Sequence, residues 1–212
     1  MAKKLEGAGL RGQVAGQTSL STVGKEGHGL TYRGYAIEDL ADKAKFEEVA
    51  YLLLYGHLPN RTEFETYQKK LISNRKLPEE LKKTLELIPA SAHPMDVMRT
   101  GCSVMGNLEP EGDFSNQNDE ADRILAILSS IICYWYRFSH DGVSVDTETS
   151  HETIGGQFLS LLTGKEPSED HIRCLDTSLI LYAEHGFNAS TFAARTCAVS
   201  YTHLTLPTTL SV

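Results

Sequence analysis

The stretch ILAILSSIICYWY, residues 124–136, decides the fold class of this chain. Drawn as a helix, it is apolar on nearly every side, and the helical pattern extends from Glu120 to about Ser139. Because a helix of this kind needs neighbours on several faces, we do not expect a single layer of helices. The run lies between Arg123 and Arg137 and is well short of the ~20 residues that span a bilayer. We therefore expect it to be the buried core helix of a helical protein.

Outward from this helix, the sequence from residue 36 onward keeps a helical period. The segment FEEVAYLLLYG, residues 46–56, ends at a glycine that suits a helix C-terminus. Its expected buried face consists of Phe46, Val49, Ala50, Leu53 and Leu54. Further helices are predicted over residues 62–74, 77–89, 91–108, 152–164 and 168–185.

Local signals at the ends or faces of four of these helices support them. In the segment 91–108, Ser91 is the expected cap, and Met95, Met98, Cys102 and Met105 are expected to line one face. Ser168 is the expected cap of the last of these helices, and Gly164 the end of the one before it. Asn60 and Arg61 precede the helix at 62–74, whose acids come early and whose lysines come late.

The first 35 residues differ from the rest because they are rich in glycine. Short extended pieces are expected around Thr22 and around Thr31 and Tyr32. The sequence contains no βαβ alternation, no GxGxxG motif and no P-loop. The predicted fold class is therefore all-α, with a short extended or β segment at the N-terminus.

Composition restricts the function. The 212 residues are 41% hydrophobic and 23% charged, as in ordinary soluble globular proteins, and the net charge is −8. This charge argues against binding to nucleic acid, but a local positive site for a small anion remains possible. The cysteines at 102, 133, 174 and 197 have no metal-binding spacing, so we expect no metal site. We expect buried free thiols in a reducing cytoplasm, no signal peptide and no membrane partner.

The candidate site lies in LYAEHGFNASTFAAR, residues 181–195. Gly186 is a natural end for one helix, and Asn188 is a strong cap for the next. His185 therefore lies at the end of one helix and beside the start of another. Free N–H groups at a helix start attract anions, and a histidine can bind a carboxylate or a carbonyl oxygen. On residue types alone, a capped helix break with a structural histidine is more common than a small-anion pocket.

Five stretches in order carry a resemblance to a known family: YRGY followed by IEDLA, FEEVAYLLLYGHLP, HPMDVMRTG, SSIICYWYRFSH and LYAEHGFNASTF. Together they resemble the citrate synthase family, and HPMDVMRTG and YWYRFSH are most similar to its 2-methylcitrate synthase branch. The resemblance runs from about residue 12 to 198.

This resemblance implies a homodimer whose chains each have a helical large domain and a small domain. The implied reaction joins propionyl-CoA or acetyl-CoA to oxaloacetate and releases CoA. A carboxylate removes the proton next to the thioester, histidines assist, and the thioester is hydrolysed. Acyl-CoA is a substrate, so no cofactor is implied.

The same resemblance places the oxaloacetate-contacting histidine of the family at His185. We take His185 and Asn188 as the candidate substrate-binding residues. The family usually has Glu after this histidine, whereas this chain has Gly186, which either loosens the turn or is a sequence error.

The family's catalytic residues are expected in HGG and GFGHPVY motifs and at a later aspartate. Neither motif occurs in this sequence, so we expect no catalytic residue here. Residues 1–35 are expected to be the extended segment, and residues 36–198 part of a citrate synthase large domain without the small domain.

The segment VSYTHLTLPT, residues 199–208, has the sequence that a common transposon-based sequencing adapter encodes in one frame. We therefore expect residues 199–212 not to be native. The alternative is a divergent natural C-terminus.

Two other functions stay open. The chain can be a genuine short, non-catalytic helical module for dimerisation or binding, which a stop codon in clean DNA reads after codon 198 would support. An open frame that encodes HGG would support the enzyme. A standalone oxaloacetate-binding protein is the weakest interpretation, because the arginines that clamp the carboxylates are absent.

Overall fold

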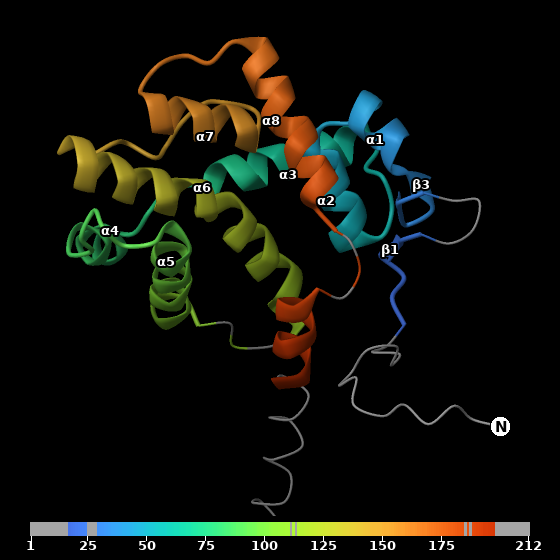
Figure 1. The fold of residues 1–212 in the computed structure, drawn as a ribbon, viewed down its shortest axis with the longest axis horizontal. Coiled ribbons are helices and arrows are strands. Elements are labelled where there is room, and N and C mark those ends of the chain that lie inside the picture. Colours follow the sequence, from blue (N-terminus) through green and yellow to red (C-terminus); the bar gives the residue numbers. More distant parts are fainter. Residues whose placement is uncertain are drawn as a thin grey trace, which may run out of the picture. The chain divides into compact units, whose positions relative to one another are not determined.

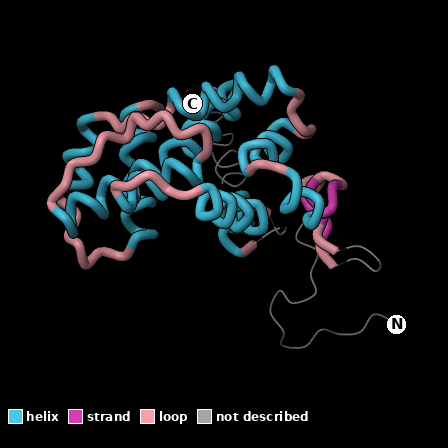
Figure 2. The backbone as a smooth tube through the Cα atoms, turned by 90° about the horizontal axis from the view of Figure 1, so that it is seen from above, coloured by secondary structure: helices cyan, strands magenta, loops and turns pink. Residues whose placement is uncertain are grey.

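The computed structural model describes residues 17–24, 29–110, 112, 114–184, 186 and 188–197. The chain divides into two compact units, one of Tyr35–Ala183 and the other of Met1–Gly34 with Glu184–Val212. Helices make up nearly all of the regular structure, and the short strands lie near the N-terminus (Figure 2). The predicted all-α fold with a short extended N-terminal segment is confirmed. Within the described residues, no helix is long and apolar enough to span a membrane.

The unit Tyr35–Ala183 is built from eight α-helices. The short strand β3, Tyr35–Ala36, leads into them, and a turn of 3-10 helix at Phe114–Asn116 precedes α6. The helices are α1 Ile37–Lys43, α2 Phe46–Tyr55, α3 Arg61–Ser73, α4 Glu79–Glu86, α5 Pro94–Leu108, α6 Gln117–Asp141, α7 Ile154–Thr163 and α8 Glu169–Tyr182.

Helix α6 is the centre of this unit. It packs against α3, α4, α5 and α7, and Figure 1 shows it crossing between them. Ala126, Ile131 and Trp135 are almost completely buried, so the predicted core helix is confirmed. Its two apolar ends differ from the prediction, because Ile124 is 44% exposed and Tyr136 is 39% exposed.

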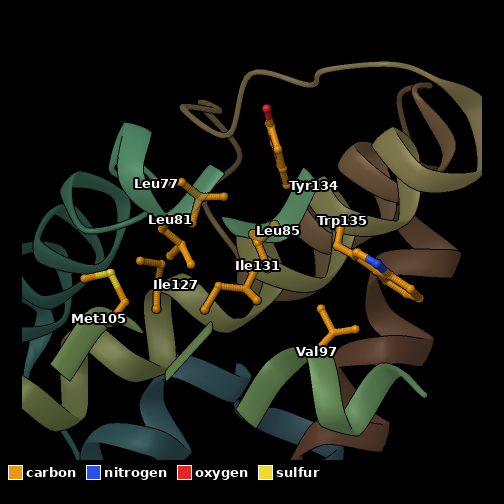
Figure 3. Close-up of a cluster of buried hydrophobic side chains, with 9 residues drawn as sticks. All are labelled: Leu77, Leu81, Leu85, Val97, Met105, Ile127, Ile131, Tyr134 and Trp135. Carbon is orange, nitrogen blue, oxygen red and sulfur yellow. The ribbon is translucent and has the colours of Figure 1, made fainter. Parts of the chain in front are cut away.

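A hydrophobic cluster lies where α4 and α5 meet α6 (Figure 3). Leu81 and Leu85 of α4 are fully buried against it, and the indole N–H of Trp135 donates to the Ile88 carbonyl at 3.2 Å. Tryptophan is therefore buried without leaving its polar atom unpaired. The cluster consists of Leu77, Leu81, Leu85, Val97, Met105, Ile127, Ile131, Tyr134 and Trp135.

Most predicted helix ends are confirmed. Gly56 and Gly164 end α2 and α7 with φ of 96° and 68°, the left-handed region that favours glycine. Asn60 caps α3 by accepting from the Glu63 N–H at 3.0 Å, and Ser168 caps α8 by accepting from the His171 N–H at 3.4 Å.

The predictions for α5 were partly wrong. His93, not Ser91, is the cap, and its Nδ1 accepts from the Met95 N–H at 3.2 Å. Met95 is 63% exposed, whereas the buried stripe runs through Val97, Gly101 and Met105. Met95 was predicted to be buried but is exposed, whereas Gly101 is buried. At Gly101 helix α6 comes so close that a larger side chain would not fit.

Two further predictions need correction. In α2 the fully buried leucine is Leu52, whereas Leu54 is 37% exposed. Of the four cysteines, Cys133 is buried and Cys102 is partly buried, but Cys174 and Cys197 are exposed. The spacing of apolar residues along the sequence does not show which of several apolar positions on a helix will pack against another helix.

The other unit holds a two-stranded antiparallel ladder and a helix. Strands β1, Ser21–Thr22, and β2, Thr31–Tyr32, pair with Ser21 opposite Tyr32. The helix spans residues 189–197 and is exposed along its length. The predicted boundary at residue 198 and the predicted non-native tail 199–212 lie outside the described residues.

Candidate functional site

The candidate site is the turn at residues 184–188, which follows α8 along the chain. Gly186 has φ of 92°, so the backbone turns through a conformation that glycine adopts without steric cost. The Asn188 N–H donates to the Gly186 carbonyl at 2.9 Å, which closes the turn. A break between two helices is therefore confirmed, but α8 ends at Tyr182, earlier than predicted, so Gly186 lies within the connection and does not end the helix.

Asn188 caps the helix at 189–197, as predicted. Its Oδ1 accepts from the Thr191 N–H at 2.7 Å, and its carbonyl accepts from the Phe192 N–H at 2.9 Å. The side chain thereby satisfies one of the N–H groups that a helix start leaves free. Asn188 therefore fixes the direction in which this helix starts.

Glu184 holds the other side of the turn, and sequence reasoning missed it. Its carboxylate accepts from the Gly186 N–H, and its Oε1 accepts from the Ser21 hydroxyl at 3.3 Å. Its own N–H donates to the Tyr32 hydroxyl at 3.2 Å. Burial raises the pKa of Tyr32, so this hydroxyl stays protonated at neutral pH. Glu184 and the two strands thus support the turn from one side, and Asn188 supports it from the other.

His185 lies between two residues that these hydrogen bonds hold, but it is itself outside the described residues. The helix that starts after Asn188 offers N–H groups and a helix dipole that favour an anion. The residues from Asn188 to Cys197 are exposed, so solvent and small solutes reach this helix start. The turn can thus present a hydrogen-bonding group to a small carboxylate.

The cavities of the helical unit are poorer candidates. A cavity of about 680 Å³ is lined by both signs of charge, with Lys70, Lys76 and Arg123 beside Glu79, Glu109, Asp119 and Glu120. The carboxylates outnumber the cations, which disfavours a dianion. Among the described residues, no group of three or more His, Cys, Asp or Glu side chains is placed to hold a metal ion.

The chain is similar to citrate synthases in sequence over most of its length. The family model "Citrate synthase, C-terminal domain" matches residues 9–209. A protein of Shewanella oneidensis named 2-methylcitrate synthase is 66% identical over 197 residues, which cover 93% of this chain and 52% of that protein. A protein of Acidithiobacillus ferridurans named citrate synthase is 36% identical, covering 87% of this chain and 50% of that protein.

The fold comparison agrees with these matches. The crystal structure of citrate synthase from Thermotoga maritima superposes with a TM-score of 0.74 at 33% identity, covering 88% of this chain and 49% of that one. The chain therefore spans about half the length of the relatives that it matches.

Proposed function

Because the chain belongs to the citrate synthase family, we propose that it supplies part of an enzyme that condenses propionyl-CoA with oxaloacetate to give 2-methylcitrate and CoA. The observation that carries the choice of substrate is the 66% identity to the Shewanella oneidensis relative of that name, against 36% for the Acidithiobacillus ferridurans citrate synthase. Acetyl-CoA, giving citrate, is the alternative substrate.

The proposed chemistry makes a carbon–carbon bond. Removal of a proton next to the thioester gives an enol or enolate, whose carbon attacks the ketone carbon of oxaloacetate. Water then cleaves the thioester and releases CoA. The proton is weakly acidic, so its removal has to be matched by hydrogen bonds to the developing negative oxygen. The whole reaction is that of an acyltransferase, with acyl-CoA as a substrate.

In this proposal the turn at 184–188 binds oxaloacetate. His185 contacts the dicarboxylate, while Asn188 orients the helix start and Glu184 holds the turn in place. What supports these roles is the pair of hydrogen bonds on either side of His185, to Glu184 and to Asn188. A group preorganised in this way loses little conformational freedom when the ligand binds.

We also propose that the enzyme works as a cytoplasmic homodimer and has no nucleic-acid or membrane partner. The net charge of −8 disfavours nucleic acid. The free cysteines fit a reducing compartment.

The test uses a chimera in which residues 9–198 replace the matching half of the Shewanella oneidensis relative. We expect the chimera to release CoA from propionyl-CoA and oxaloacetate and to form 2-methylcitrate, identified by mass spectrometry. The 212-residue chain alone, assayed in parallel, should show only the uncatalysed rate, because it contains neither the HGG nor the GFGHPVY motif. A folded chimera without turnover would overturn the proposal, and a preference for acetyl-CoA would overturn the choice of substrate.

His185→Ala in the chimera tests the binding role. We expect the oxaloacetate KM to rise roughly ten- to a hundred-fold, since a hydrogen bond to a charged ligand contributes about 1.5–3 kcal/mol. His171→Ala is the matched control, because His171 lies on the exposed face of α8. Unchanged kinetics in His185→Ala would show that His185 is structural.

A further inference from the structure

Two buried carboxylates meet at the first turn of α7. Glu47 is fully buried and Asp176 is 4% exposed. Glu47 Oε1 accepts from the N–H of Ile154, the first residue of α7, at 2.7 Å. A methyl group on the next residue, Gly155, would lie 3.0 Å from Asp176 Oδ1. Both side chains are therefore packed against the same backbone.

This carboxylate pair connects three helices. Glu47 is in the first turn of α2 and Asp176 is in the middle of α8, while Ile154 begins α7. Asp176 Oδ2 also accepts from the N–H of Phe46, the first residue of α2, at 3.4 Å. The starts of α2 and α7 are thus each held by one of the two carboxylates.

Hydrogen bonds compensate the two carboxylates only in part. Glu47 Oε2 and Asp176 Oδ1 have no hydrogen-bond partner among the described residues. Asp122, which is also fully buried, contrasts with them, because it accepts from the Tyr55 hydroxyl and the Lys70 ammonium at 2.5 Å each and from a further tyrosine. Hydrogen bonds favour the charged form of a buried carboxylate, so an oxygen without a donor favours the neutral form.

Among the described residues, no cation forms an ion pair with either carboxylate. Arg75, fully buried between α3 and α4, attracts Glu47; its Nη1 donates to the His151 carbonyl at 2.5 Å, and its Nε and Nη2 have no hydrogen-bond partner among the described residues. The imidazole of His151 lies 3.4 Å from the Glu166 carboxylate.

Arg173 of α8 and Lys45 before α2 act on Asp176. The Arg173 guanidinium, however, donates to the carbonyls of Ala41, Asp42 and Ala44. Lys45 has its amino group 3.9 Å from the Glu152 carboxylate. None of these cations forms an ion pair with Asp176 that would replace its lost hydration.

Burial, with the charge of Asp176 second, raises the pKa of Glu47 from its ordinary 4.5 to about 7. Burial also raises the pKa of Asp176, against its hydrogen bond from Phe46 and the attraction of Arg173. Both carboxyls therefore favour a proton, and the attraction of Arg75 does not reverse this for Glu47. Two carboxyls that interact through their charges titrate as a pair.

We propose that Glu47 and Asp176 carry a single negative charge at neutral pH, so that the fold holds one proton at the start of α7 and releases it as the pH rises. Release leaves two like charges at the junction of α2, α7 and α8 and loosens it. This inference is independent of the proposed reaction. Loss of the proton destabilises the packing of α8, so the stability of this helix depends on pH near neutrality.

The direction of the pH dependence follows from proton binding. Between about pH 4.5 and 7 the folded chain keeps the Glu47 proton that the unfolded chain has lost. The free energy of unfolding therefore falls as the pH rises through this window and levels off above it. A shift of the size given for Glu47 corresponds to a change of roughly 100-fold or more in the folding equilibrium constant.

The experiment is urea unfolding of the 212-residue chain at pH values from 5 to 8.5. We expect the folding equilibrium constant to fall about 100-fold over the window in the wild type. Glu47→Gln, which keeps an acceptor for the Ile154 N–H and carries no charge, should remove this fall and be more stable than the wild type above pH 7. Asp176→Asn should move the fall to lower pH. Glu80→Gln, on the exposed face of α4, is the control and should behave as the wild type.

A second measurement covers variants that fail to fold. In the wild-type chain with ¹³C-labelled glutamate side-chain carboxyls, one carboxyl resonance, that of Glu47, should titrate near pH 7 in the NMR spectrum. Titration of all of them near pH 4.5 would overturn the proposal. So would a wild type whose stability does not change between pH 5 and 8, or a Glu47→Gln variant that keeps the pH dependence of the wild type.

Discussion

Asp122 shows how this fold retains a buried charge. It lies on α6 and accepts from the hydroxyls of Tyr55 and Tyr67 and from the ammonium of Lys70, which belong to α2 and α3. Burial, and then the hydrogen bond to Asp122, raises the pKa of Tyr55 to about 12, so this hydroxyl remains a donor. One carboxylate on the central helix therefore holds two neighbouring helices in place.

Asp122→Ala should lower the free energy of unfolding by about 3 kcal/mol, because it leaves the buried Tyr67 hydroxyl without its acceptor and leaves the Lys70 ammonium only the exposed Asp119. Asp119→Ala is the matched control. Asp119 also pairs with Lys70, at 2.5 Å, but its side chain is 70% exposed, so we expect little change. Urea unfolding at pH 7 measures both variants, and equal losses would show that Asp122 acts only as a surface partner of Lys70.

The candidate site illustrates which residues a sequence reveals. Asn188 was predicted as a cap because its partner, the Thr191 N–H, is three positions away. Glu184 was not predicted because one of its partners, Ser21, is 163 positions away. A side chain whose role depends on a distant segment leaves no local signal.

At the scale of elements, the crossing of α5 over α6 depends on a missing side chain. A methyl group on Gly101 would lie 2.6 Å from Ile131 Cγ2 and 2.9 Å from its Cδ1. The two helices therefore approach more closely than any larger residue at this position allows. This explains why glycine lies in the buried stripe of α5.

Gly101→Ala should destabilise the chain by about 1–3 kcal/mol, because the extra methyl group overpacks the core. Gly106→Ala, on the same helix, is the control, since a methyl group there meets nothing within 4 Å. That variant should be neutral or stabilising by up to about 1 kcal/mol through higher helix propensity. Thermal unfolding followed by circular dichroism distinguishes them, and a stabilising Gly101→Ala would contradict the close approach.

At the scale of the whole molecule, the helical unit exposes apolar surface beside its central helix. A cavity of about 360 Å³ between α5 and α6 is lined by Cys102, Met105, Ile124 and Ile127 with polar residues at its edge. Ile124 is 44% exposed there. Exposed apolar surface of this kind favours association between copies of the chain.

We expect the purified 212-residue chain to self-associate in light scattering at micromolar concentration. Ile124→Lys should reduce this association, because it places a charge in the apolar surface. Leu87→Lys is the matched control: Leu87 is 85% exposed but lies outside this cavity, so its replacement should have little effect. A monodisperse wild-type monomer would refute the prediction and favour the alternative of a genuine short helical protein.

The sequence by itself determined the fold class, several helix ends and the presence of the turn. The caps at Ser168 and Asn188 and the stops at Gly56 and Gly164 were predicted, since these signals act over one helical turn. The core position of α6 was predicted because its apolar residues lie on nearly all sides of the helix and not on one face alone.

Only the tertiary structure decided which faces meet and which polar groups are buried between them. In the sequence, Glu47 looks like any acidic residue in the first turn of a helix, where such residues are usually exposed. In the structure it is fully buried against α7. Met95 is as apolar as Met105, yet only Met105 is in the core. The physical reason is that burial depends on elements brought from distant parts of the chain, whereas periodicity and capping depend on residues within a few positions of one another.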